Sequence, residues 1–525
     1  MRSSLIHILK KRGIMLLFLL LVITINLQSQ TNYFNNYYNP NNTGSMSGAI
    51  YPTNNGYVCA GLMQDLIYWK NNIVLSKLDS VGNLLSFKEI KLDSSNYYVG
   101  AWGGGGFAKC SNGDFILGGD IFSDTSNGNI QYIKHFIMKM NNNLDTLWTK
   151  NIDFGSFWES GIYQCKETSD HGFVLCGETI ISSTIINVLF IKTDSIGNTL
   201  WKKIYNISGY NGDQRDKALN VTETPDKGFL LGCYTYSIPS MGMYEGSGDG
   251  VVIKTDSLGN AVWIKNVGGP LMDDAAIIRV CQDGNYLIAT TYAYFTAQYN
   301  DHSKSKLRLI KVTPAGNIIW DKQYEPIISS LSVKKVIELA SGDIVVGGTK
   351  SHHTSEYQGY YDSYLFKLNA NGESIWYREY AKATDTVLLT WNSLYNFEQT
   401  PDGGFVACGE MSVNPQIPQS IWVFKTDSLG CLQPGCQYVG VEELQAAKGE
   451  LKIFPNPATT QTTITYPTTE KAIILQLYNM LGQLIYEEKL SKGSSQTIID
   501  TREYKKGLYK VVVGESSGSL LLNNE

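Results

Sequence analysis

One phrase recurs along this chain at a nearly constant spacing. A turn rich in Gly, Asn and Asp is followed by an apolar, strand-like segment seven times, as in "SDHGFVLCG" and "PDKGFLLGC". The first large apolar residue of each copy is called its landmark. The seven landmarks are Tyr57, Phe115, Phe173, Phe229, Tyr286, Ile344 and Phe405. Their separations are 58, 58, 56, 57, 58 and 61 residues. So regular a period indicates an array of similar structural units.

Each copy has a second half that begins at a lysine. The seven lysines are Lys77, Lys139, Lys192, Lys254, Lys311, Lys367 and Lys425. In five copies a tryptophan follows nine residues later, at Trp148, Trp201, Trp263, Trp320 and Trp376. Each unit is therefore predicted to hold four short strands, because Asp, Asn and Gly at both short turns suit tight hairpins. Seven such units predict a seven-bladed β-propeller, with a linear β-solenoid of shorter repeats as the alternative.

The array begins and ends in mid-unit, which predicts how a ring would close. The seventh copy continues after Lys425 as "TDSLGCLQPGC" and has no tryptophan. The segment from Phe34 to Tyr38 aligns with "WKKIY" from Trp201, and it lies 23 residues before Tyr57, as Trp263 lies before Tyr286. We therefore expect the N-terminal strand to complete the last blade.

Two residue columns raise a choice between packing and function. Small residues stand three positions after each landmark (Ala60, Gly118, Cys176, Gly232, Ala289, Gly347 and Cys408), which fits strands close to a ring axis. The tryptophans are expected to pack the wider gaps rather than dock a cofactor. The lysines would form an anion-binding ring, pair with acids on the next strand or be simply solvated, and the last two outcomes are the more common.

The N-terminus has the pattern of a targeting segment. Arg2, Lys10, Lys11 and Arg12 precede the apolar run from Ile14 to Ile25, which is short for a membrane span and suits a signal peptide. We assign residues 1–29 to the signal peptide, with a single membrane anchor as the alternative, and expect no transmembrane segment after cleavage. The net charge of -5 with mixed signs gives no basic stripe, which argues against a nucleic-acid partner.

The two faces of the predicted propeller, residues 30–436, differ in their loops. The turns within each strand pair are short, whereas the other loops are long and rich in aromatic residues. The candidate ligand-binding residues on that loop face are Tyr97, Tyr98, Trp102, Trp158, Tyr210, Tyr236, Tyr244, Tyr294, Tyr357 and Tyr360. Rigid aromatic side chains on loops suit a glycan or protein ligand, although they also pack long loops against their own domain.

After a linker at residues 437–450 the repeat stops. Residues 451–525 contain "FPNPAT", "LYNMLGQLIY" and "GLYKVVV" within short alternating strands, which predicts a small β-sandwich. These motifs resemble the type A C-terminal sorting domain of type IX secretion cargo. The resemblance assigns the sorting motif to Pro455, Asn456, Pro457, Gly482, Gly507 and Tyr509. It implies the type IX secretion machinery as a partner, and secretion or display on the outer surface of a Gram-negative bacterium. The ending "GSLLLNNE" departs from the family's basic and apolar tail.

The nine cysteines predict one disulfide. Cys431 and Cys436 flank "LQPG", whose Pro and Gly favour a tight turn, so an exported protein is expected to bond them. Cys165 and Cys176 are placed opposite each other across a hairpin, where a second, strained bond is conceivable. The other five cysteines are expected to be small buried residues.

No motif for catalysis, for a metal or for a cofactor stands out. The six histidines are scattered, and "GGGG" at residues 103–106 lacks the Lys and Ser/Thr of a phosphate loop. Asp273, Asp274 and Glu245 are the acids placed to act as paired glycosidase carboxylates at the propeller mouth. The leading hypothesis is therefore an exported glycan- or protein-binding protein. The alternatives are a structural or adhesion component of the surface and a glycan-cleaving enzyme.

Overall fold

The computed structural model describes the chain in segments. They are residues 32–39, 44–65, 70–91, 95–98, 106–124, 130–152, 160–182, 185–207, 214–237, 247–269, 271, 273–294, 304–355, 358–382, 390–413, 417–434, 436, 451–466, 473–479, 484–514 and 516–523. All regular elements among them are strands. The predicted signal peptide and linker lie outside the described residues. The chain divides into two compact units, one ending at Pro434 and the other beginning at Gly435.

The first unit consists of seven antiparallel groups of strands, called blades, with five strands in the second blade and four in each of the others. Blade 1 holds β2 (Ser45–Thr53), β3 (Gly56–Asp65), β4 (Lys70–Asp79) and β5 (Leu84–Ile90). Blade 2 holds β6 (Ser95–Tyr98) and β7 (Phe107–Lys109), which both pair with β8 (Phe115–Asp124), then β9 (Ile130–Met140) and β10 (Thr146–Ile152). Blade 3 holds β11 (Ser160–Glu167), β12 (Phe173–Ser182), β13 (Ile185–Thr193) and β14 (Thr199–Tyr205).

The remaining blades repeat this order. Blade 4 holds β15 (Gln214–Glu223), β16 (Phe229–Ser237), β17 (Ser247–Thr255) and β18 (Ala261–Asn266). Blade 5 holds β19 (Ile277–Val280), β20 (Tyr286–Tyr294), β21 (Lys304–Val312) and the first part of β22 (Ile318–Glu338). The rest of β22 opens blade 6, with β23 (Ile344–Ser355), β24 (Gln358–Leu368) and β25 (Ser374–Tyr380). Blade 7 holds β26 (Thr390–Gln399), β27 (Phe405–Val413) and β28 (Ile417–Thr426).

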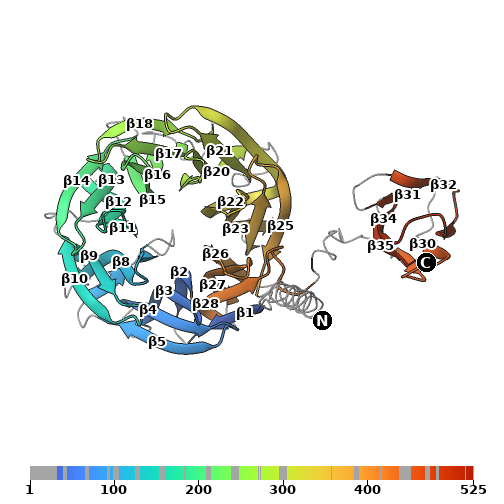
Figure 1. Cartoon of the computed structure of the whole chain (residues 1–525), viewed down its shortest axis with the longest axis horizontal. Helices are drawn as coiled ribbons and strands as arrows, with labels where there is room; N and C mark the ends of the chain where they lie inside the picture. The colour runs from blue at the N-terminus through green and yellow to red at the C-terminus, as the bar shows by residue number, and fades with distance from the viewer. Residues whose placement is uncertain are drawn as a thin grey trace, which may run out of the picture. The chain divides into compact units, whose positions relative to one another are not determined.

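The blades form a closed ring, as Figure 1 shows. A separate apolar cluster lies between every two neighbouring blades, including one between the seventh and the first. The predicted small-residue column lies in these interfaces. A methyl group at Gly347, for example, would come within 2.7 Å of the Phe397 ring of the next blade. The seven-bladed propeller predicted from the period is confirmed.

The N-terminal strand closes the ring as predicted. Strand β1 (Phe34–Tyr38) pairs antiparallel with β28, and Phe34 stands opposite Lys425. Lys192 stands opposite Trp201 in the same way, so Phe34 takes the place of the missing tryptophan. The side chain of Trp422 also donates a hydrogen bond from Nε1 to Asn35 Oδ1 at 2.7 Å. Blade 7 is therefore built from both ends of the propeller sequence.

The strand tryptophans pack against the following blade. A methyl group at Gly197 would lie 2.8 Å from the ring of Trp148, and one at Gly430 would lie 2.9 Å from Trp376. Both glycines have a positive φ, which the tight turn between the third and fourth strands requires. Each turn therefore needs glycine for its conformation and for the ring that covers it. The packing role predicted for the tryptophans is confirmed.

The second unit is a small two-sheet sandwich. One sheet holds β29 (Lys452–Phe454), β30 (Gln461–Thr465) and β33 (Gln496–Asp500). The other holds β32 (Leu484–Leu490), β31 (Ile473–Asn479), β34 (Gly507–Val513) and β35 (Ser516–Leu522). Both sheets contribute to one core, with Ile464 and Ile499 from the first and Leu475, Val511 and Leu520 from the second.

Candidate functional site

The lysine column is paired with acids. The ammonium groups of six of these lysines lie close to a carboxylate in the first turn of their own blade. The pairs are Lys139–Asp114 (3.7 Å), Lys192–Asp170 (2.9 Å), Lys254–Asp226 (2.8 Å), Lys311–Asp283 (2.7 Å), Lys367–Asp343 (3.0 Å) and Lys425–Asp402 (2.9 Å). Six of the seven lysines are therefore paired rather than free to form an anion-binding ring, but their acids lie in the first turn and not on the next strand as expected. Each such pair, called a staple below, ties the third strand of a blade to its first turn.

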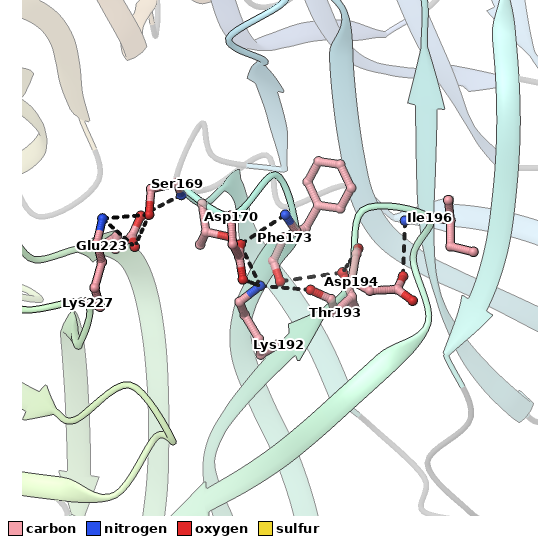
Figure 2. Close-up of polar contacts among 11 residues, drawn as sticks. Ser169, Asp170, Phe173, Lys192, Thr193, Asp194, Ile196, Glu223 and Lys227 are labelled. Carbon is pink, nitrogen blue, oxygen red and sulfur yellow. Dashed lines mark hydrogen bonds and ion pairs between the residues drawn. The ribbon is translucent and has the colours of Figure 1, made fainter.

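Figure 2 shows one such staple around Lys192. Lys192 donates to Asp170 and, at 2.9 Å, to the carbonyl of Thr193. Burial works against the charge of Asp170, but hydrogen bonds from Thr168, Lys192 and the Gly172 N–H lower its pKa to about 2. Asp170 is thus ionised at neutral pH and accepts from Lys192 as a carboxylate.

Blade 1 shows why one lysine differs. Thr53 pairs directly with Gly56, so this first turn holds only Asn54 and Asn55 and is shorter than in the other blades. It carries no acid, and within the described segments Lys77 has no ion pair. The turn length, rather than the lysine, decides whether a staple forms.

A second contact recurs between blades and was not predicted. Glutamates at the end of the first strand accept backbone N–H groups from the first turn of the preceding blade. Glu167 accepts from Ser111 at 2.6 Å, Glu223 from Ser169 at 2.7 Å and Glu338 from Gln282 at 2.6 Å. Glu223 and its partner Ser169 are drawn in Figure 2. The sequence signal was a glutamate six residues before three of the landmarks.

The described structure covers part of the predicted aromatic face. Tyr236, near the end of β16, and Tyr360, in β24, are both half-buried. Tyr97, Tyr98 and Tyr294 lie in β6 and β20 as backbone positions. The remaining candidates, Trp102, Trp158, Tyr210, Tyr244 and Tyr357, lie outside the described residues. Their role stays a prediction.

A cavity opens beside Tyr236, between blades 3 and 4. It has a volume of about 320 Å³ and is lined by Glu178, Ile186, Arg215, Lys217, Tyr234 and Tyr236. In the register of β15 and β16, Arg215 lies opposite Tyr236 and Lys217 opposite Tyr234. The Lys217 ammonium sits 5.5 Å from the ring centre of Tyr234 and 5.7 Å from that of Tyr163. The cavity is therefore lined by two aromatic rings, Tyr234 and Tyr236, and by the charged side chains of Arg215, Lys217 and Glu178.

The chemistry of this cavity is set by burial. Burial raises the pKa of Glu178, while Lys217 and the hydroxyl of Tyr163, which donates at 2.8 Å, counteract it. Burial also raises the pKa of Tyr234 to about 12, so this phenol stays protonated. The cavity thus offers neutral and cationic donors together with one carboxylate acceptor, which is a set suited to binding a polar ligand.

A second aromatic pair lies on the loop face and was not among the residues predicted from the sequence. Tyr361 and Trp391 come from neighbouring blades, pair in parallel and bring their ring centres to 5.0 Å. Trp391 keeps 43% of its surface exposed. The sequence signal was present in "TWNSL", but only the meeting of β24 and β26 placed this ring beside Tyr361.

Asp273 and Asp274, two of the predicted acids at the propeller mouth, accept hydrogen bonds from backbone N–H groups. Asp273 is buried and accepts N–H groups from Gly269 and Ala293. Asp274 accepts from Val333 at 3.0 Å and from Ala275 at 2.8 Å. Glu245 lies outside the described residues. Both carboxylates therefore have a structural use, and Asp274 links blade 5 to blade 6 through the Val333 N–H.

The cysteines correct one expectation. Cys431 and Cys436 are disulfide-bonded, in agreement with the predicted bond. Cys165 and Cys176 are not opposite each other: a bulge between Ile162 and Gln164 sets Gln164 against Cys176. The two thiols therefore enter different inter-blade clusters, and both remain free. The other five are buried and free, as expected.

The sorting motif holds the last strand of its unit. Asn456 Oδ1 accepts the N–H of Leu521 at 2.8 Å, and the Ala458 N–H donates to the Leu521 carbonyl at 2.8 Å. Pro455 accepts the hydroxyl of Thr462 at 2.9 Å. Tyr509 is buried in β34 and donates to the carbonyl of Lys505 at 2.8 Å. Pro457 lies between Asn456 and Ala458, and Gly507 is the first residue of β34. Gly482 lies outside the described residues.

Comparison with known proteins identifies this second unit. Residues 452–521 match a family described as the secretion system C-terminal sorting domain. The matched domain indicates that the protein is exported by the type IX secretion system and is secreted or held at the cell surface. Within the described segments, no helix has the length and apolar character to cross a membrane.

The propeller is similar to solved structures at low identity. A protein of unknown function from Dyadobacter fermentans is 12% identical, with a TM-score of 0.40, over 61% of this chain and 93% of that one. The β-propeller domain of the Trilobed protease from Pyrococcus furiosus is 8% identical, with a TM-score of 0.38, over 73% and 95%. A PL25 ulvan lyase is 9% identical, with a TM-score of 0.44, over 77% and 97%. At these TM-scores the likenesses carry no argument about function. No curated protein matches the chain.

Proposed function

We propose that this exported protein is a binding protein whose propeller presents its loop face to a glycan. The observation that carries the proposal is the cavity between blades 3 and 4, where Tyr234 and Tyr236 meet Arg215, Lys217 and Glu178. Aromatic faces stack on sugar rings, and charged groups fix the orientation of hydroxyls. The exposed Trp391 beside Tyr361 adds a further ring on the same side.

The rest of the chain supports this function. A signal peptide at residues 1–29 would direct the first export step, and residues 451–525 would engage the type IX machinery. The propeller at residues 30–436 would reach the surface as a rigid ring, with the Cys431–Cys436 bond fixing its exit. The linker at residues 437–450 would separate binding from sorting.

The test is a glycan array probed with the purified protein, together with a saccharide-release assay. Retention of a glycan that falls at least about tenfold with Tyr236→Ala would support the proposal, since one lost stacking contact costs about 1–2 kcal/mol. Tyr37→Ala is the matched control, because Tyr37 is 44% exposed on the outer strand β1. Binding unchanged by Tyr236→Ala would contradict this site.

Two other outcomes would replace the proposal. Release of saccharide would favour a glycan-cleaving enzyme and would turn attention to carboxylates of the loop face. Absence of glycan retention together with strong self-association would favour a structural or adhesion component. Retention of a surface protein instead of a glycan would keep the binding face and change its ligand class.

A further inference from the structure

A second cavity lies at the centre of the ring. It has a volume of about 300 Å³, and its lining includes residues from the first strand of all seven blades. Figure 1 shows several of these strands, among them β2, β11, β15, β22 and β26, facing the middle of the ring. This cavity, called the channel cavity below, is large enough for a small ligand.

The channel cavity is strongly basic, whereas the chain is acidic. Its lining holds Lys109, Lys166, Arg279, Lys334 and Lys335 against only Glu167 and Glu398. That is an excess of three positive charges in a protein whose net charge is -5. Positive charges gathered in a concave, low-dielectric space attract anions far more strongly than charges spread over a surface.

Lys166 and Arg279 occupy equivalent positions in the first strands of their blades. Lys166 lies opposite Val174 and Arg279 opposite Leu287, in each case one residue after the landmark that opens the second strand. Lys335 lies opposite Gly347, which is two residues further from the first turn. These positions are close to the short first turns, so the channel cavity is a different site from the one on the loop face.

The basic groups differ in what they already contact. Lys335 donates to Glu398 at 2.6 Å and to Asn396 at 2.9 Å, and Lys109 donates to the carbonyl of Pro52 at 3.0 Å. Glu167 is held by the Ser111 N–H. With the residues that the structure describes, Lys166 and Arg279 make no hydrogen bond or ion pair. Lys166 and Arg279 therefore lack a directly bonded counter-charge, and the Glu398 carboxylate acts on Lys166 only at longer range.

We propose that the channel cavity binds a small oxyanion, such as a phosphate, a sulfate or a sugar carboxylate, between Lys166 and Arg279. Arg279 is exposed to the channel and Lys166 is half-buried there, so an entering anion can reach both. Like charges held close together repel each other, and a bound anion offsets that repulsion. Burial, reinforced by the charges of Arg279 and Lys335, lowers the pKa of Lys166 to about 8. A bound anion relieves this repulsion. The site needs nothing from the loop-face cavity, so either proposal can fail alone.

Isothermal titration calorimetry of the purified protein tests the proposal, with inorganic phosphate, sulfate and glucuronate added at constant ionic strength in chloride buffer. We expect at least one of them to bind at one site per chain with a Kd of about 1 mM or tighter. Lys166→Met and Arg279→Gln should each weaken that binding at least about tenfold. Lys492→Met removes the same charge from an exposed position of the sorting unit and should leave binding unchanged.

The charge-preserving variants Lys166→Arg and Arg279→Lys guard against misfolding. They should keep binding within about threefold of the unmodified protein, because the positive charge stays in the channel. The proposal is overturned if none of the three anions binds better than chloride. It is also overturned if a folded Lys166→Met or Arg279→Gln protein binds as the unmodified protein does.

Discussion

Phe34 stands opposite Lys425 where the first strand of the propeller meets the last one. The ring of Phe34 also covers the first blade: a methyl group at Gly82 would come within 2.6 Å of it. One residue thus joins blade 7 to blade 1 by backbone pairing and by side-chain packing. The ring is closed by sheet hydrogen bonds rather than by packing alone, which leaves blade 7 without an unfinished edge.

Phe34→Ala should destabilise the propeller. Phe34 is 8% exposed and packs against Tyr57 at a ring-centre distance of 5.7 Å. Removing such a buried ring costs about 3 kcal/mol in the free energy of unfolding. Urea denaturation would measure the loss. Tyr37→Ala, at a position 44% exposed on the same strand, should cost within about 0.5 kcal/mol. Equal losses for the two variants would show that Phe34 does not anchor the closing strand.

The Asp170 staple predicts part of the acid sensitivity. Its pKa is about 2 in the folded protein and near 4 when unfolded, so its stabilisation is complete above about pH 4 and is lost as the pH falls through about 2. Because the carboxylate is 59% exposed, the contribution is less than about 1 kcal/mol.

Asp170→Asn should therefore flatten the dependence of the unfolding free energy on pH between about pH 4 and pH 2. Denaturant titrations at several pH values would show the change. Asp145→Asn, whose side chain is 68% exposed, should preserve the original slope. A steeper acid loss in Asp170→Asn than in the unmodified protein would contradict the assigned sign.

The cysteines predict a definite thiol count. Seven are free and buried, so a thiol reagent should find essentially none in the native protein and seven after denaturation without reductant. Burial raises the pKa of thiols such as Cys176, which slows their reaction further. Cys431→Ser should add one thiol by releasing Cys436. A count of five would mean that Cys165 and Cys176 are bonded after all.

Asn456 is predicted to support export through the fold of the sorting unit. Asn456→Ala removes the acceptor for the Leu521 N–H and should destabilise this unit by about 1 kcal/mol. The measurement is the exported fraction relative to the cell-associated precursor, which should fall. Gln496→Ala, at an exposed position of β33, is the control. If export is unchanged in Asn456→Ala, the contact between Asn456 and Leu521 is not required for sorting.

Local chemistry made much of the fold predictable. Turn residues, strand alternation and the landmark spacing are properties of short segments. The seven units and the closing strand at Phe34 could therefore be predicted from the sequence. The motif around Asn456 was similarly local. Pairing of the lysines was expected, but with acids on the next strand, whereas the acids lie in the first turns. The shorter first turn of blade 1 left Lys77 without an acid.

The sequence by itself determined the number of blades, the closing strand and the sorting unit, because each depends on contacts within a repeat or on its period. Only the tertiary structure decided what the blades bring together. The bulge beside Gln164 separated Cys165 from Cys176, and the meeting of neighbouring blades placed Trp391 beside Tyr361. Lys166 and Arg279 face one channel although two blades supply them, because a ring makes neighbours of residues that no local pattern relates.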